Sequence, residues 1–226
     1  MSQLGAFFRA AWAVCAKDLR AEFRTRYALS AIGLFAITTL VVISTALGPF
    51  GLGQDLLGAL LWVVLFFAAM AGLSRTFVHE EESHTAPALR LAAPPAAVYL
   101  GKYLFNLVLL VLMEVLIVPL FMVMMNLHLA TPGLFLLVLF LGNLGLSGTT
   151  TIVAAMVAQA SARGALFTVL AFPLLYPLLV AAIKGTNATL TGQDLALIWP
   201  NVQVLVAYTV AMVTVALLLF PSIWTE

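Results

Sequence analysis

The sequence predicts an all-α integral membrane protein with six transmembrane helices, preceded by an interfacial helix and interrupted by a short cytoplasmic helix. Three observations lead to this prediction. Of the 226 residues, 64% are hydrophobic and 8% are charged, whereas soluble domains are about 45–50% apolar and roughly 25% charged. Apolar stretches recur at a length of about 20 residues, which as a helix crosses a hydrocarbon core about 30 Å thick. Lysine and arginine are almost confined to one set of connecting segments.

Residues 1–26 are predicted to form an amphipathic helix. The large apolar side chains recur at spacings of four and three: Leu4, Phe8, Trp12, Cys15, Leu19 and Phe23. They occupy an arc of about 100° on a helix. The basic side chains fall on the other side: Arg9, Lys17, Arg20 and Arg24. Such a helix lies in the plane of the membrane interface, although a simple topological stop is the alternative. The charged part is too long for a cleavable signal peptide, so we expect the first span to be retained.

The six spans follow within one transmembrane domain, residues 1–226. They are predicted at 27–47, 56–78, 98–126, 133–158, 164–183 and 199–221. Glycine and proline mark the linkers, as in Pro94-Pro95 before the third span. The fourth span is rich in small residues that permit close helix packing, Gly142, Gly145 and Gly148 among them. In the fifth span, Pro173 and Pro177 lie one turn apart and predict a kink.

The distribution of basic residues predicts the orientation. All but one of the ten lysines and arginines fall in the N-terminal segment, in or next to the connection between the second and third spans, or between the fourth and fifth spans. The exception is Lys184. Because basic residues favour the cytoplasmic side of a membrane, both termini and residues 79–97 are expected in the cytoplasm.

Residues 79–84 read HEEESH and suggest a metal site at first sight. The zinc-protease motif places its histidines at i and i+4, whereas His79 and His84 are five residues apart. On a helix they would point about 140° apart, so they cannot share one ion. We therefore expect no metal site, and a metalloenzyme using these histidines with Glu80 is the weaker alternative. The acids, the apolar Ala86–Ala93 and the double proline instead predict a short helix along the membrane that docks a cytoplasmic protein.

Glu114 is the one acid inside a predicted span. A carboxylate in the bilayer costs several kcal/mol unless it is neutral or paired, which makes Glu114 a functional candidate. A structural hydrogen bond to a neighbouring helix is the favoured role, and a proton-coupled carrier is an alternative. The sequence has no G-x-x-x-x-G-K-[ST] phosphate loop, so any ATP must be bound by another subunit. The net charge of +1 argues against a nucleic-acid partner.

Four places in the chain resemble a known family. They are the charged run Lys17–Arg24, the pattern Phe77-x-x-Glu80 followed by Leu89 and the prolines, Lys102 with Pro119, and Arg163-Gly164 followed by Phe172–Leu179, FPLLYPLL. Together they resemble type-2 ABC transporter permeases and, more closely, the haem exporter protein B family (CcmB) of cytochrome c maturation. One departure occurs. The family often has Asp-Gly-Ser-Leu-Glu where this chain has Ser83-His84-Thr85-Ala86-Pro87.

The resemblance implies a non-catalytic permease subunit in the bacterial inner membrane. Its partners would be a CcmA-like ATPase, CcmC- and CcmD-like membrane subunits and a CcmE-like haem chaperone. The ATPase would bind ATP and the complex would handle haem, so this chain is expected to bind no cofactor directly. The expected ATPase contact is Phe77, Glu80, Glu81 and Glu82, with Leu89 as an apolar anchor. The alternative function is a type-2 exporter of a drug, lipid or polysaccharide.

Overall fold

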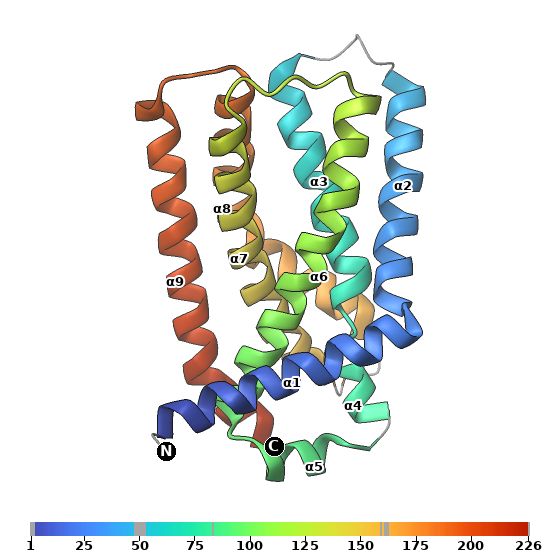
Figure 1. Ribbon diagram of the computed structural model, residues 1–226, viewed down its shortest axis with the longest axis vertical. Helices are drawn as coiled ribbons and strands as arrows, with labels where there is room; N and C mark the ends of the chain where they lie inside the picture. The colour runs from blue at the N-terminus through green and yellow to red at the C-terminus, as the bar shows by residue number, and fades with distance from the viewer. Residues whose placement is uncertain (1–2, 48–52, 83, 159, 161–162, 226) are drawn as a thin grey trace.

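The computed structural model describes residues 3–47, 53–82, 84–158, 160 and 163–225, arranged as shown in Figure 1. Six helices are long and apolar enough to cross a membrane, which confirms the predicted all-α membrane fold. They are α2 (Tyr27–Leu47), α3 (Gln54–Leu73), α6 (Pro95–Met124), α7 (Pro132–Val157), α8 (Arg163–Leu190) and α9 (Leu195–Thr225). The other helices of the described residues are α1 (Gln3–Thr25), α4 (Val78–Glu82) and α5 (Ala86–Ala92).

The three other helices gather at one end of the bundle, called the α5 end from here on. In Figure 1, α1 lies across the bundle near this end, α4 and α5 lie at the bottom, and α9 ends beside them. The chain returns to this end because it makes an even number of crossings, six in all. The α5 end therefore brings together segments from the start, the middle and the end of the sequence.

The chain turns sharply from α1 into α2. Arg26 stands between them with a φ of 54°, in the left-handed region that few non-glycine residues adopt. The Leu29 backbone N–H donates a hydrogen bond to Glu22 Oε1 at 2.9 Å. That N–H is one of the groups that the first turn of α2 leaves without a helical acceptor. An acid there also complements the helix dipole, so Glu22 stabilises the angle between the two helices.

The helix α1 packs mainly on α6, through a face made of small side chains. Ala11, Val14 and Cys15 are buried. A Cβ atom at Gly101 of α6 would lie 2.6 Å from the Ala11 carbonyl oxygen, so the two backbones approach closely. Most of the predicted apolar stripe remains exposed and available to lipid: Leu4, Phe8, Trp12 and Phe23. The stripe and the protein-facing side are therefore adjacent faces of α1 that overlap at Cys15.

The central helix of the bundle is α7, which packs on α6, α8 and α9. Its glycines permit this packing. A Cβ atom at Gly142 would overlap the Trp62 indole of α3, and one at Gly145 would lie 2.5 Å from Leu178 of α8. The prediction that the small residues of the fourth span serve close helix packing is confirmed.

Some helix ends differ from the predicted span limits. The second span ends at Leu73 instead of residue 78, the fifth continues to Leu190, and the sixth begins at Leu195. The extension of α8 carries polar residues that find partners within the bundle. The Trp62 indole N–H donates to Thr186 Oγ1 at 2.8 Å, which lets α8 continue past residue 183 with its polar side chain buried and paired.

The predicted kink prolines both lie inside α8. Neither Pro173 nor Pro177 can donate the helical hydrogen bond to the preceding turn. Both are exposed on the outer surface of the bundle, where lipid can cover the ring. The kink itself stays a prediction.

Candidate functional site

A folded segment joins α3 to α6 at the α5 end. The sequence predicted one short helix within residues 79–97, whereas the structure has two, α4 and α5. Between them His84 adopts a φ of 54°, the left-handed conformation that glycine adopts without cost. This is the position at which the CcmB family tends to have glycine. The turn conformation is therefore present although the glycine is not.

The same departure from the family pattern includes Pro87, which lies at the start of α5. As the second residue of that helix, its missing N–H needs no helical acceptor. The double proline acts as predicted. The helix α5 ends at Ala92, and α6 begins at Pro95 with Pro94 in an extended conformation. The prolines therefore set both ends of this segment and the direction in which the chain enters the third span.

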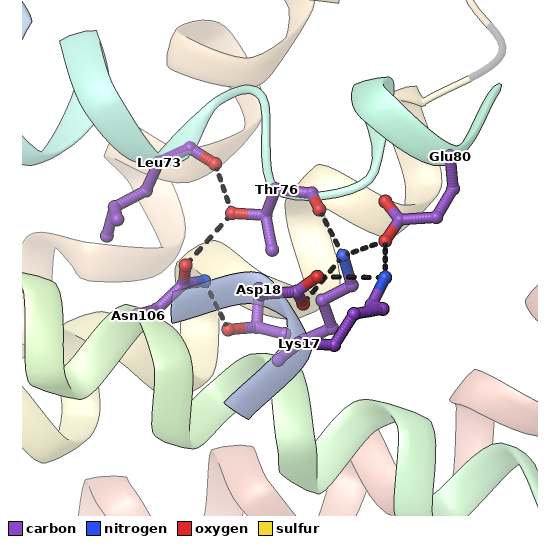
Figure 2. A network of polar contacts seen from close by, with 8 residues as sticks. Lys17, Asp18, Leu73, Thr76, Glu80 and Asn106 are labelled. Carbon is purple, nitrogen blue, oxygen red and sulfur yellow. Dashed lines mark hydrogen bonds and ion pairs between the residues drawn. The ribbon is translucent and has the colours of Figure 1, made fainter. Parts of the chain in front are cut away.

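A buried ion cluster fastens this segment to the bundle, as Figure 2 shows. The Lys102 ammonium of α6 donates to Glu80 Oε1 of α4 at 2.6 Å and to the Thr76 carbonyl oxygen at 2.7 Å. It also lies 3.0 Å from Asp18 Oδ2 of α1. Lys102 is 2% exposed and Glu80 is 1% exposed. Three elements distant in sequence are therefore joined at one ammonium group.

Lys17 completes the cluster and makes its formal charge zero. Its ammonium donates to Glu80 Oε1 at 2.7 Å and lies 2.9 Å from Asp18 Oδ1. Burial favours the neutral form of Glu80, but Lys102 and then Lys17 outweigh it, so the pKa of Glu80 lies below its ordinary value. Burial also opposes the charge on Lys17, but Asp18 and Glu80 together raise its pKa above the ordinary value. Both shifts favour the fully charged cluster.

A chain of hydrogen bonds leads from the cluster into the membrane-spanning part. The Thr76 hydroxyl lies 2.7 Å from the Leu73 carbonyl oxygen and 3.0 Å from Asn106 Oδ1, and it can donate to either (Figure 2). The Asn106 amide of α6 donates to Thr151 Oγ1 of α7 at 2.8 Å. Thr151 in turn donates to the Ser147 carbonyl oxygen at 2.6 Å. The segment is therefore connected through α6 to the central helix α7.

An aromatic cluster fastens the same segment to the end of α9. The Phe77 ring lies 5.7 Å from the rings of both Phe220 and Trp224, measured between centroids. The Lys102 ammonium lies 5.2 Å from the centre of the Phe77 ring. The Arg90 guanidinium of α5 lies 5.3 Å from the centre of the Trp224 ring. These cation–π distances are within the attractive range. Sequence analysis missed this role of Trp224, because a tryptophan near a helix end is typical of a lipid anchor as well.

The structure separates the predicted ATPase contact residues into two groups. Phe77, at 1% exposed, and Glu80 are buried inside this chain, and Leu89 is half-buried against the core. Glu81 is half-buried and Glu82 is exposed. Leu91 of α5, which was not in the predicted contact set, is 91% exposed.

A cleft of about 280 Å³ lies beside the ion cluster, between α1, α3 and α6. Its lining includes Asp18, Glu80 and Lys102, and also Arg75 in the turn that follows α3. Arg75 pairs with Glu82 at 3.0 Å and donates to the Tyr27 hydroxyl at 3.1 Å. The wall of the cleft therefore contains one member of the exposed ion pair and three members of the buried ion cluster.

The remaining sequence-predicted sites lie apart from this cluster. Within the described part of the chain, no three His, Cys, Asp or Glu side chains gather as they would to hold a metal ion. The His79 side chain and Ser83 lie outside the described residues. Glu114 lies in the spanning part of α6, where the Asn143 amide of α7 donates to its Oε2 at 2.6 Å. This is the kind of hydrogen bond from a neighbouring helix that the sequence favoured.

Comparison with known proteins identifies the family. The chain matches the family described as "CcmB protein" over residues 9–223, which is nearly its whole length. It is also similar to "Heme exporter protein B" of Bradyrhizobium diazoefficiens, with 26% identity over 182 residues, covering 80% of this chain and 82% of that protein. Both findings agree with the resemblance of the motifs and with the six spans. The chain therefore belongs to the CcmB protein family, and it is a multi-pass membrane subunit of the haem-exporter type.

Proposed function

We propose that this chain is the permease subunit of an ABC-type complex in cytochrome c biogenesis. It lies in the bacterial inner membrane with the α5 end in the cytoplasm. A CcmA-like ATPase docks there, and its ATP-driven closure moves the spans against CcmC- and CcmD-like membrane subunits. The movement serves haem delivery to a periplasmic CcmE-like chaperone and release of the loaded chaperone. This chain performs no catalysis, because the partner hydrolyses ATP and the complex handles haem.

One observation carries this proposal. The α4–α5 segment projects from the bundle at the end where α1 and the end of α9 also lie, and it is fastened to α1, α6 and α9 by buried contacts. Displacement of a segment held in this way must move the helices to which it is attached, because closely packed interiors transmit displacement. The expected response is a rigid-body or hinge movement of the spans. The orientation is supported by the basic residues, all but one of which lie toward this end of the predicted topology.

The buried and exposed residues of the segment take different parts in this proposal. Leu91, with Glu81 and Glu82 nearby, forms the surface that meets the ATPase. Phe77 and Glu80 hold the segment to the bundle and transmit the movement, because they are already packed within the chain. Leu89 anchors α5 from the inner side. The predicted contact set is thus divided between docking and transmission.

The test replaces Leu91 with aspartate. Burying a leucine in an interface contributes about 1.5–3 kcal/mol, and a charge in its place adds a desolvation cost. We expect Leu91→Asp to reduce co-purification of the ATPase roughly tenfold or more, since about 1.4 kcal/mol corresponds to one decade. Holocytochrome c should fall with it.

The matched control is Leu195→Asp. Leu195 is also an exposed leucine, but it begins α9 at the opposite end of the bundle. This variant should retain the ATPase. If Leu91→Asp retains the ATPase and normal holocytochrome c, the docking surface on α5 is refuted. If Leu195→Asp loses the ATPase equally, the orientation is refuted.

A further inference from the structure

A groove on the outer surface of the bundle, between α6 and α7, contains one acidic side chain. The groove measures about 450 Å³ and lies in the membrane-spanning part of both helices. Its lining is apolar apart from Glu114 and Asn143, and it includes Val115, Pro119, Leu136 and Phe140. Val115, Leu136 and Phe140 are exposed. The groove is unrelated to the ion cluster at the α5 end.

The Glu114 carboxyl group is only half satisfied. Its Oε2 accepts a hydrogen bond from Asn143, but its Oε1 is buried and has no hydrogen-bond partner among the described residues. Pro119 lies in the same groove, one turn after Val115, and it has no N–H to donate to the Val115 carbonyl. Polar groups left unpaired in hydrocarbon cost several kcal/mol each. Lipid acyl chains have no donor, so lipid in this groove leaves that cost in place.

We propose that this groove receives a transmembrane helix of another membrane subunit, and that this helix carries an amide or hydroxyl side chain at the depth of Glu114. Amides and hydroxyls can both donate and accept, so they satisfy Oε1 whether the carboxyl is ionised or protonated. The apolar walls supply the packing surface for such a helix. The proposal rests on the membrane subunits of the function proposed above and names where one of them binds, within the membrane and away from the cytoplasmic contact with the ATPase.

A second copy of this chain fits the groove less well. In a symmetric dimer the same patch faces itself, so Glu114 would meet Glu114. The exposed side chains that line the groove in the described structure are apolar and offer no donor. The groove is therefore complementary to a helix of different sequence. A self-contact is an outcome that the experiment distinguishes.

The experiment is site-specific photocrosslinking in native membranes that contain the assembled complex. A benzoyl-phenylalanine probe is placed at Leu136, a groove residue that is 62% exposed, and separately at Val210 of α9, which is 61% exposed. We expect an adduct with a different membrane subunit from the Leu136 probe only. Absence of a protein adduct at Leu136, an adduct with a second copy, or an equal adduct at Val210 overturns the proposal.

The second arm tests Glu114 itself, in the chain that carries the Leu136 probe. Glu114→Leu should reduce the adduct about fivefold, which corresponds to about 1 kcal/mol for a hydrogen bond between helices in a membrane. Glu114→Gln retains a hydrogen-bonding side chain and should keep most of the adduct. An adduct that is unchanged in Glu114→Leu refutes the role of the carboxyl group. Co-purification of the ATPase should be normal in both variants. A result that refutes the groove proposal can therefore be told apart from one that refutes the docking surface on α5.

Discussion

At the scale of single residues, Lys102 connects three helices that are far apart in the sequence, α1, α4 and α6. Its ammonium group donates hydrogen bonds to Glu80 and to the Thr76 backbone, and it forms an ion pair with Asp18. A buried charge of this kind is tolerated only because it is hydrogen-bonded and opposite charges are adjacent. Removing one charged side chain of this cluster is therefore expected to lower the free energy of unfolding far more than breaking an exposed ion pair does.

Replacing Lys102 with methionine should destabilise the folded chain by about 3–5 kcal/mol, because it removes the buried cation of the cluster and leaves the two buried carboxylates with only the partly exposed Lys17. The measurement is the free energy of unfolding in an SDS titration of the detergent-solubilised protein. The control is Arg75→Met, which breaks the exposed pair with Glu82 and should cost about 1 kcal/mol or less. If Lys102→Met lowers the free energy of unfolding no more than Arg75→Met does, the cluster is not buried as described.

Some of these residues could be found from the sequence and others could not. The pattern Phe77-x-x-Glu80 and Lys102 were singled out by resemblance, and the structure brings all three together. Lys17 and Asp18 were seen only as part of a charged run. The available signal was the spacing of Asp18 and Glu22, one turn apart beside the apolar stripe. Spacing shows that two acids share a face of a helix, but not that another helix covers that face.

At the scale of elements, the contact between α1 and α6 depends on the absence of a side chain at Gly101. Interfacial helices are held to a membrane by apolar side chains inserted between lipids. Here a second attachment is present, because the small residues of α1 lie directly on the backbone of α6. The elbow is therefore part of the bundle as well as part of the membrane surface.

Gly101→Ala should separate α1 from α6 and destabilise the protein by about 1–3 kcal/mol, as overpacking of a close contact does. The new Cβ would lie 2.6 Å from a backbone carbonyl oxygen, which cannot move aside as a side-chain end can. Thermal unfolding in detergent measures the effect.

The matched control is Gly33→Ala in α2. A Cβ atom at Gly33 meets no atom within 4 Å, so this variant should be neutral or slightly stabilising, since alanine is the better helix former. Equal melting temperatures for the two variants would contradict the close packing of α1 on α6.

The boundaries of elements were harder to predict than their existence. Phe77 and Val78 are apolar like the residues that precede Ser74, so the predicted second span was extended to residue 78. The structure ends α3 at Leu73 because Thr76 and the following residues form buried contacts of their own, with Lys102, Asn106 and Phe220. Hydropathy reports that a side chain avoids water. It does not report whether lipid or protein replaces the water.

At the scale of the whole molecule, the ion cluster links stability to pH. Glu80 has a lowered pKa, so its stabilising contribution is present above its ordinary value of 4.5 and is lost as the pH falls through the lowered value. Lys17 has a raised pKa, so its contribution is present below its ordinary value of 10.5 and is lost as the pH rises through the raised value. Between these limits the contribution of the cluster is constant.

The expected result concerns the difference between wild type and Glu80→Gln. At neutral pH the wild type should be more stable. The gap in melting temperature should narrow as the pH falls from 4.5 through the lowered pKa of Glu80, because Glu80 is then protonated and both chains carry a neutral side chain at position 80. Glu82→Gln is the control. Because Glu82 is exposed, this variant should differ little from wild type in melting temperature at any pH. A gap for Glu80→Gln that is constant down to pH 3 would contradict the buried ion cluster.

By itself, the sequence determined the class of protein, the number of spans and the family motifs. These follow from the length and composition of the apolar stretches and from local patterns, which do not depend on how the helices pack. Only the tertiary structure decided which side of each motif is turned inward. Phe77 and Glu80 are internal because α1, α6 and α9 converge on them, and Leu91 is exposed because none of these helices covers it. The physical reason is that burial in protein depends on contacts between residues far apart in the chain, such as that between Lys17 and Glu80, which no local pattern encodes.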